Sequence, residues 1–336
     1  MEFLMMRKIM KSKYKILSLV LLLAFASCSF TSKTFSDPDK DKLLVQVITF
    51  VLEQGHFDPI ELDDEFSAEL FKDYLETVDP VKRYFYESDF KDFEKFKLTI
   101  DDQLKVSDIT FFNIVNERML KRLEEAKAIY KDVLSQPFDY TLDEDFDTDH
   151  ENKPFPKNKK EMRERWRQQL KFSTLSNYDD IYTQEQLAKE KDPSYEMKTP
   201  AEIDAEAREA TLKSLNIYFE DYIDDQRRED WFAIYVNTIV EEFDPHTYYL
   251  APKGKEDFDQ RMSGKLEGIG ARLQKRMDHI KIVELISGGP AWRSKELEVE
   301  DVILKVKQED EEFPVDIVGM RINDAIKYIK GPKGTK

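Results

Sequence analysis

The sequence has little that could carry metal or disulfide chemistry, with one cysteine and four histidines among its 336 residues. A single cysteine, Cys28, excludes an intrachain disulfide. The histidines stand far apart, without the spacing of a metal site, at His56, His150, His246 and His279. Two acidic runs, 63–65 and 143–145, fit a solvated surface better than paired catalytic carboxylates. The sequence therefore predicts no metal, no cofactor and no catalytic set.

Positive charge is also in deficit, because 52 Lys and Arg stand against 69 Asp and Glu, a formal net charge of −17. Nucleic-acid binding depends on neutralising phosphates with Lys and Arg, so a general electrostatic footprint for nucleic acid is excluded. We interpret the negative charge as a source of solubility. A hydrophobic fraction of 40%, with 12% aromatic residues, is ample for a packed core. The length is enough for about two domains.

An apolar run at residues 16–26 is too short to cross a bilayer as a helix. It follows a basic stretch and precedes the small residues Ala26 and Ser27, which is the order of a bacterial export signal. The basic stretch contains Arg7, Lys8, Lys11, Lys13 and Lys15. We therefore interpret residues 1–27 as an export signal.

Cys28 stands directly behind this signal, which indicates a lipoprotein signal cleaved before Cys28 and acylated on it. The alternative is an ordinary cleaved signal with a chance cysteine, because Phe25 stands where lipoprotein signals usually carry leucine. Residues 28–40 are rich in Ser, Thr, Lys, Asp and Pro and fit a flexible tether. The protein is then expected in the bacterial periplasm, in contact with the membrane only through the lipid anchor.

Residues 41–250 fit a helical domain, because Gly55 is the single glycine between Asp41 and Glu242. Apolar residues recur there with helical spacing. The predicted helices are Lys42–Gln54, Phe66–Leu75, Thr110–Leu134, Glu161–Asn177 and Ala201–Glu242, the last with a break near Asp224 and Asp225. Thr199-Pro200 is typical of a helix start. The aromatic stretch 84–96 fits core better than a partner surface.

Glycine returns in the last part of the chain, first in Gly268-Ile269-Gly270. Glycine tolerates backbone angles that other residues avoid and lets another chain approach closely. Successive free N–H groups form an anion-binding concavity, and the strand that follows, Ala271-Arg272-Leu273, can accept a further strand along its edge. The pattern predicts capture of a peptide's C-terminal carboxylate by the loop.

The residues downstream supply a second strand, a turn, a third strand and a helix. These are His279–Ile286, Ser287–Ala291, Asp301–Val306 and Arg321–Lys330. The helix presents one apolar face, which is the second wall of the expected groove, with Ile322, Ala325, Ile326 and Ile329. The alternative for these four residues is simple domain core. Leu266 and Ile269 are expected to line the pocket for the last side chain of the peptide.

The order of these elements resembles a PDZ domain, and the sequence motifs resemble those of the tail-specific (C-terminal-processing) serine proteases. The motifs that carry the resemblance are Phe243-Asp244-Pro245-His246-Thr247, Leu266-Glu267-Gly268-Ile269-Gly270, Gly288-Gly289-Pro290-Ala291 and Ile329-Lys330-Gly331-Pro332-Lys333-Gly334. The resemblance implies an α+β fold, with a helical N-terminal domain and an incomplete PDZ domain at residues 251–336 that lacks its last strand.

The resemblance also implies a serine nucleophile with a lysine general base, in a protease domain that follows the PDZ domain. The catalytic serine and lysine are expected in that following domain and not in this sequence. The chain is therefore expected to be the inactive front portion of a longer protease. Its implied partners are the C-terminal tails of envelope proteins, with an adaptor lipoprotein as a further candidate. The alternative is a non-catalytic PDZ peptide-binding lipoprotein that acts as scaffold or competitor.

Overall fold

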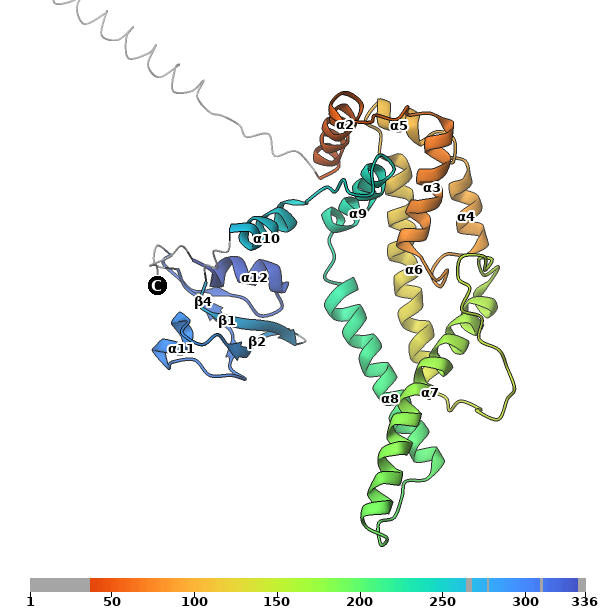
Figure 1. The fold of residues 1–336 in the computed structure, drawn as a ribbon, viewed down its shortest axis with the longest axis vertical. Coiled ribbons are helices and arrows are strands. Elements are labelled where there is room, and N and C mark those ends of the chain that lie inside the picture. The colour runs from red at the N-terminus through yellow and green to blue at the C-terminus, as the bar shows by residue number, and fades with distance from the viewer. Residues whose placement is uncertain (1–36, 264–267, 277, 309–310, 332–336) are drawn as a thin grey trace, which may run out of the picture. The chain divides into compact units, whose positions relative to one another are not determined.

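A computed structural model describes residues 37–263, 268–276, 278–308 and 311–331. The described residues from 44 onward belong to one compact unit. In this unit a helical region is followed by a region of short strands, so the fold is α+β, as the sequence predicted (Figure 1). No helix among the described residues has the length and apolar character that a bilayer span requires.

The helical region, up to residue 263, consists of helices and the linkers that join them. Their bounds are α2 Asp37–Gly55, α3 Asp64–Val78, α4 Glu87–Glu94, α5 Ile100–Lys105, α6 Thr110–Leu134, α7 Lys159–Lys191, α8 Pro200–Tyr218, the π-helical turn η1 Phe219–Ile223, α9 Arg228–Glu241 and α10 Pro252–Ser263. α6 has its predicted bounds. α7 runs beyond the predicted end at Asn177, because neither proline nor glycine interrupts the sequence before Pro193.

Side-chain caps set several helix ends. Asp63 accepts a hydrogen bond from the Phe66 N–H at 3.0 Å at the start of α3. Thr199 and Glu202 form a reciprocal capping box at the start of α8, and Pro200 occupies the first turn. The predicted break near Asp224 is present, because η1 ends there and α9 begins at Arg228. Local sequence therefore determines these boundaries.

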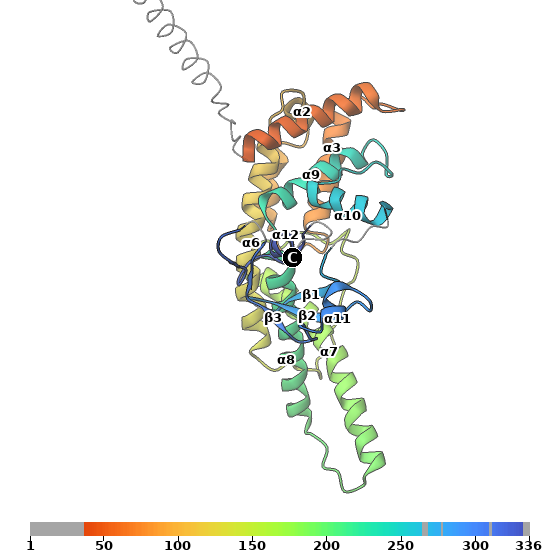
Figure 2. The same cartoon turned by 90° about the vertical axis from the view of Figure 1, so that its left-hand side faces the viewer.

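The core of the helical region is dense in aromatic rings. Phe111 of α6 packs edge-on against Tyr74 of α3, with ring centroids 5.7 Å apart, and Phe112 stacks on Tyr235 of α9 at 5.6 Å. The stretch 84–96 contributes buried rings to the same core, which confirms its interpretation as core. These rings are Tyr84, Phe85, Tyr86 and Phe93. α7 and α8 pack against each other (Figures 1 and 2).

The sheet region follows with two small antiparallel sheets. Its strands are β1 Ala271–Arg276, β2 His279–Leu285, β3 Val302–Ile303, β4 Lys305–Val306 and β5 Val315–Asp316, and its helices are α11 Pro290–Ser294 and α12 Ile322–Ile329. The first sheet has the order β1-β2-β3, which places β1 at its edge, and the second pairs β4 with β5. The buried core is small and contains Ile280, Ile317 and Ala325.

The prediction of a single strand over Asp301–Val306 is wrong. The stretch splits at Leu304, so that β3 pairs with β2 in one sheet while β4 pairs with β5 in the other. The Leu304 carbonyl accepts a hydrogen bond from the Ile317 N–H at 3.0 Å, outside both ladders. An apolar run records burial but not which partner strand each residue pairs with, so the sequence pattern did not reveal the split.

Candidate functional site

Two glycine-containing loops, residues 268–270 and 286–291, are held together by backbone hydrogen bonds. The Ile286 N–H donates to the Gly270 carbonyl and the Ala291 N–H donates to the Ile269 carbonyl, both at 2.9 Å. The Gly289 N–H donates to the Ile286 carbonyl at 2.8 Å and closes the turn that leads into α11. Two motifs that are separate in the sequence therefore build one structure at the start of β1.

Glycine is required in this structure because the two backbones touch. A Cβ atom on Gly270 would lie 2.9 Å from the Gly289 Cα atom and 3.0 Å from the Pro290 Cδ atom. Gly270 also has φ +74°, in the left-handed region that favours glycine. A Cβ atom on Gly289 would lie 2.9 Å from the Ile286 carbonyl oxygen. Side chains at either position would push the loops apart.

The N–H groups of the 268–270 loop have no acceptor among the residues that the structure describes. Among the hydrogen bonds between described residues, none uses the N–H of Gly268, Ile269 or Gly270 as donor, whereas the carbonyls of Ile269 and Gly270 both accept. Gly268 is exposed, and Ile269 and Gly270 are half-buried. Successive N–H groups of this kind favour an anion such as a carboxylate.

A strand edge and a helix flank this loop. β1 pairs with β2 on one side only, so its other edge is unpaired among the described strands. α12 packs on β1 (Figure 1). The end of α12 reaches the loop, because a Cβ atom on Gly268 would lie 4.0 Å from the Lys330 Cγ atom. An open edge beside a helix is the geometry in which an added peptide strand is bound.

The residues predicted to line the groove fall into different environments. Ala271 and Leu273 of β1 are half-buried, and Arg272 is exposed and pairs with Glu284 at 3.1 Å. On α12, Ala325 is fully buried in the core, with Ile329 packed against that core, while Ile322 and Ile326 are half-buried. Leu266 and Cys28 lie outside the described residues. The groove assignment remains a prediction, with Ile322 and Ile326 as the helix residues that lie outside the core cluster.

The sequence did not reveal a cluster of charged residues at the other end of β1 and α12. Asp225, in the break before α9, pairs with Lys275 of β1 at 3.0 Å and with Arg321, which precedes α12, at 3.4 Å. Asp230 of α9 pairs with Arg321 at 2.9 Å. Asp225 and Arg321 are almost a hundred positions apart, and no local pattern records such a pairing.

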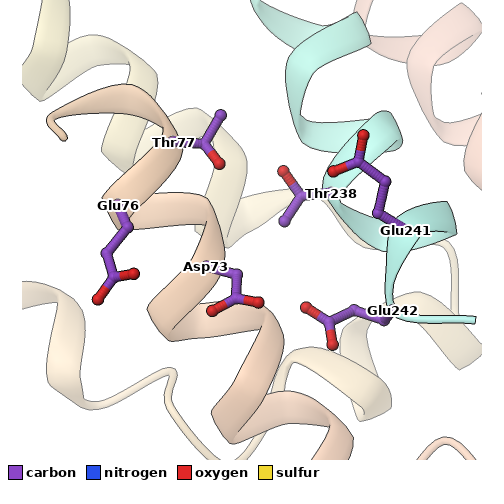
Figure 3. A pocket seen from close by; sticks show the side chains of 6 residues that line it. All are labelled: Asp73, Glu76, Thr77, Thr238, Glu241 and Glu242. Atoms are coloured by element: carbon purple, nitrogen blue, oxygen red, sulfur yellow. The ribbon is translucent and has the colours of Figure 1, made fainter. Parts of the chain in front are cut away.

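A separate acidic pocket lies in the helical region, where α3 faces the end of α9 (Figure 3). The cavity measures about 390 Å³, and the carboxylates of Asp73 and Glu242 point toward one another in it. Burial, together with the negative charges of Asp73 and Glu69, raises the pKa of Glu242 to about 7. Within the described part of the chain, no group of His, Cys, Asp and Glu side chains is suited to hold a metal ion.

A helical region followed by a sheet region with a glycine loop, an open strand edge and a flanking helix defines a PDZ-containing protein. The family model described as "Tail specific protease N-terminal domain" matches residues 48–253, more than half of the sequence. The chain therefore belongs to the tail-specific protease family, as its motifs predicted.

Individual relatives agree with this assignment. A tail-specific protease of Haemophilus influenzae is 29% identical over 299 residues, which cover 89% of this chain and 40% of the relative. The carboxy-terminal processing protease CtpA of Bacillus subtilis is 34% identical over 93 residues, or 28% of this chain and 18% of the relative. A probable CtpA-like serine protease of Staphylococcus aureus is 30% identical over 38% of this chain and 24% of the relative. The chain thus spans well under half the length of these relatives.

One solved structure is also similar to part of the chain. It is the PDZ domain of a carboxy-terminal protease from Vibrio cholerae in complex with a peptide. The match is 51% identical and covers 21% of this chain and 70% of that one, with a TM-score of 0.20.

Proposed function

We propose that this chain is the substrate-recognition portion of an exported tail-specific serine protease and that its sheet region binds the free C-terminus of a polypeptide. The observation that carries the proposal is the 268–270 loop, whose three consecutive N–H groups have no acceptor among the described residues. The loop leads directly into β1, at the open edge of a sheet. A carboxylate at the loop and a peptide strand along β1 satisfy both sets of backbone groups together.

In this proposal each part of the site has one task. The N–H groups of Gly268, Ile269 and Gly270 donate to the terminal carboxylate of the peptide. β1 pairs with the residues that precede the C-terminus, which gives affinity without sequence preference. The apolar side chains of Ile269 and Ile326 contact the last side chain of the peptide and favour apolar tails. No catalytic residue is assigned to these 336 residues.

The cellular setting is part of the proposal. An export signal at residues 1–27 and acylation at Cys28 place the protein in the periplasm, held at the membrane by lipid. Its substrates are then envelope proteins with exposed C-terminal tails, and an adaptor lipoprotein is a candidate partner. Labelling with a fatty-acid analogue tests the anchor, because Cys28→Ser removes the label if Cys28 carries the lipid.

A pair of peptides tests the carboxylate loop. We expect a peptide with an apolar last residue and a free carboxylate to bind, and its C-terminally amidated twin to bind at least about tenfold more weakly, because a charge-assisted hydrogen bond is lost. Isothermal titration calorimetry measures both affinities. Equal affinities for the two peptides would remove the assignment.

Gly268→Val sharpens this test, because Gly268 has φ +149°, which a β-branched residue rarely adopts. We expect this variant to lose the difference between the two peptides. Gly319→Val is the matched control, since Gly319 has φ +77° at a turn before α12, outside the loop. The control should keep the preference for the free carboxylate.

A further inference from the structure

A single carboxylate bridges the two walls of the proposed groove. Asp225 pairs with Lys275 on β1 and also with Arg321 at the start of α12. Asp230 holds the same arginine, and Arg227 pairs with Asp324 beside them. The side chains of Lys275, Arg321 and Asp225 are 17%, 18% and 12% exposed, so solvent screens this bridge less than an ordinary surface ion pair.

The bridge lies at the end of the groove opposite the carboxylate loop. Gly268 adjoins Lys330 at the C-terminal end of α12, whereas Arg321 at the N-terminal end of α12 shares Asp225 with Lys275. α12 therefore runs antiparallel to β1, with the loop at one end and Asp225 at the other. A peptide strand that starts at the loop and follows β1 has to pass between Lys275 and Arg321.

The length of β1 sets how much peptide fits before this point. Lys275 lies five positions after Gly270, which corresponds to about 17 Å of strand. A peptide of four residues fits between the loop and the bridge. In a longer tail, the fifth and sixth residues from the C-terminus meet the Asp225 carboxylate.

We propose that Asp225 closes the far end of the groove, so that longer C-terminal tails bind by displacing it, and tails with acidic residues at the fifth and sixth positions from the end are preferred. The proposal rests on the proposed function, because it requires a peptide on β1. An acidic side chain replaces Asp225 as the partner of Lys275 and Arg321. A neutral or basic side chain leaves the shielded Lys275 without its acidic partner and leaves Arg321 with Asp230 alone, which is unfavourable.

Four peptides test the proposal by calorimetry on the chain. One has four apolar residues, and three ten-residue peptides extend it with Glu-Glu, Gln-Gln or Lys-Lys at the fifth and sixth positions from the end. We expect the short peptide and the Glu-Glu peptide to bind best, the Gln-Gln peptide more weakly, and the Lys-Lys peptide about tenfold more weakly than Glu-Glu. Salt should reduce the difference between Glu-Glu and Lys-Lys.

Substitutions then locate the effect. Asp225→Asn should strengthen binding of all three long peptides and leave the short peptide unchanged. Asp224→Asn is the matched control, because Asp224 pairs with Lys127 within the helical region, and it should behave as the unmodified chain. Lys275→Met keeps an aliphatic stem and should weaken the preference for Glu-Glu, and it also supplies a test if Asp225→Asn does not fold.

The outcomes separate this proposal from the one on which it rests. If the short peptide does not bind, peptide capture itself is wrong and both proposals fall. If the short peptide binds and the long peptides bind equally well regardless of charge, only the closure by Asp225 is overturned. If both Asp225→Asn and Lys275→Met bind the long peptides as the unmodified chain does, the closure by Asp225 is likewise overturned.

Discussion

The helical region and the sheet region of this protein are specified in different ways. The buried core of the helical region extends over helices α2 to α9 and is filled with large aromatic and aliphatic side chains. The buried core cluster of the sheet region is small and consists of Ile280, Ile317 and Ala325, while Ile282 and Ala291 are buried outside this cluster. The sheet region depends instead on close backbone contacts, such as that of Gly270 with Gly289. Side-chain packing therefore specifies the fold of the helical region, and backbone geometry specifies that of the sheet region.

Two buried carboxylates in the helical region, those of Asp89 and Asp79, are each held by several hydrogen-bond donors. The Asp89 carboxylate has no exposed surface, and it accepts from Arg118 and Arg122 and from the Tyr86 N–H. Burial would raise the pKa of Asp89, but these hydrogen bonds hold it below its usual value. The Asp79 carboxylate accepts from the N–H groups of three consecutive residues, 83–85. Asp89 thus joins α4 to α6, and Asp79 holds the loop that follows α3.

The largest expected effect comes from truncating a ring in the helical core. Phe112 is fully buried, and its ring centroid lies 4.9 Å from that of Phe232. Phe112→Ala should lower the free energy of unfolding by about 3–5 kcal/mol, because the transfer of the ring is lost and a cavity remains. Urea unfolding followed by circular dichroism measures the change. Phe57→Ala, at a side chain that is 102% exposed, should stay within about 0.5 kcal/mol; similar losses in both variants would contradict the core assignment.

A smaller effect is expected from a single methyl group in the sheet region. Gly270→Ala forces an alanine to φ +74° and places its Cβ against the Gly289 backbone, so we expect a local loss of about 1–3 kcal/mol. Peptide binding should be lost, and hydrogen exchange should accelerate in β2 but not in α6. Gly319→Ala carries a similar φ of +77° without any atom within 4 Å of the new Cβ, so it isolates the backbone strain. If Gly319→Ala abolished binding equally, close backbone contact would not be the reason.

The sequence predicted best what local chemistry determines. The bounds of α6 follow from its apolar periodicity, and the start of α8 follows from Thr199 and Pro200. The position of the glycine loop before β1 follows from Gly268 and Gly270, because few other residues adopt such angles. Each of these signals lies within a few residues of the feature that it predicts.

The sequence predicted least where distant residues decide. β3 and β4 belong to different sheets because their partners, β2 and β5, come from opposite sides in the chain. The pairing of Asp225 with Lys275 and Arg321 likewise depends on tertiary structure, and acidic residues near Asp225 looked like an ordinary helix break. Of the four apolar residues of α12, periodicity could not tell Ala325, which is core, from Ile322 and Ile326, which are partly exposed.

A helix cap gives a third and smaller expected effect, confined to the helical region. The Thr199 hydroxyl accepts from the Glu202 N–H at 3.3 Å, so Thr199→Ala should lower the free energy of unfolding by about 1 kcal/mol. Thr183→Ala, at an exposed position within α7, is the control and should raise it slightly, because alanine has the higher helix propensity. Urea unfolding measures both, and peptide binding should stay the same in each. A loss of binding in Thr199→Ala would show that the two regions are not specified separately.

The last expected effect is a pH dependence that belongs to the helical region alone. Burial and the charges of Asp73 and Glu69 raise the pKa of Glu242 from 4.5 to about 7. The folded protein therefore binds this proton more tightly than the unfolded chain, so the stabilisation is fully present below pH 4.5 and is lost as pH rises through about 7. Glu242→Gln should remove this part of the slope, because the amide stays neutral between Asp73 and Glu241. Glu61→Gln, at an exposed position before α3, should leave the slope unchanged. Melting temperatures measured between about pH 5 and 8 by circular dichroism provide the test. An identical slope in the unmodified chain and in Glu242→Gln would mean that the proton on Glu242 does not stabilise the contact of α3 with the end of α9.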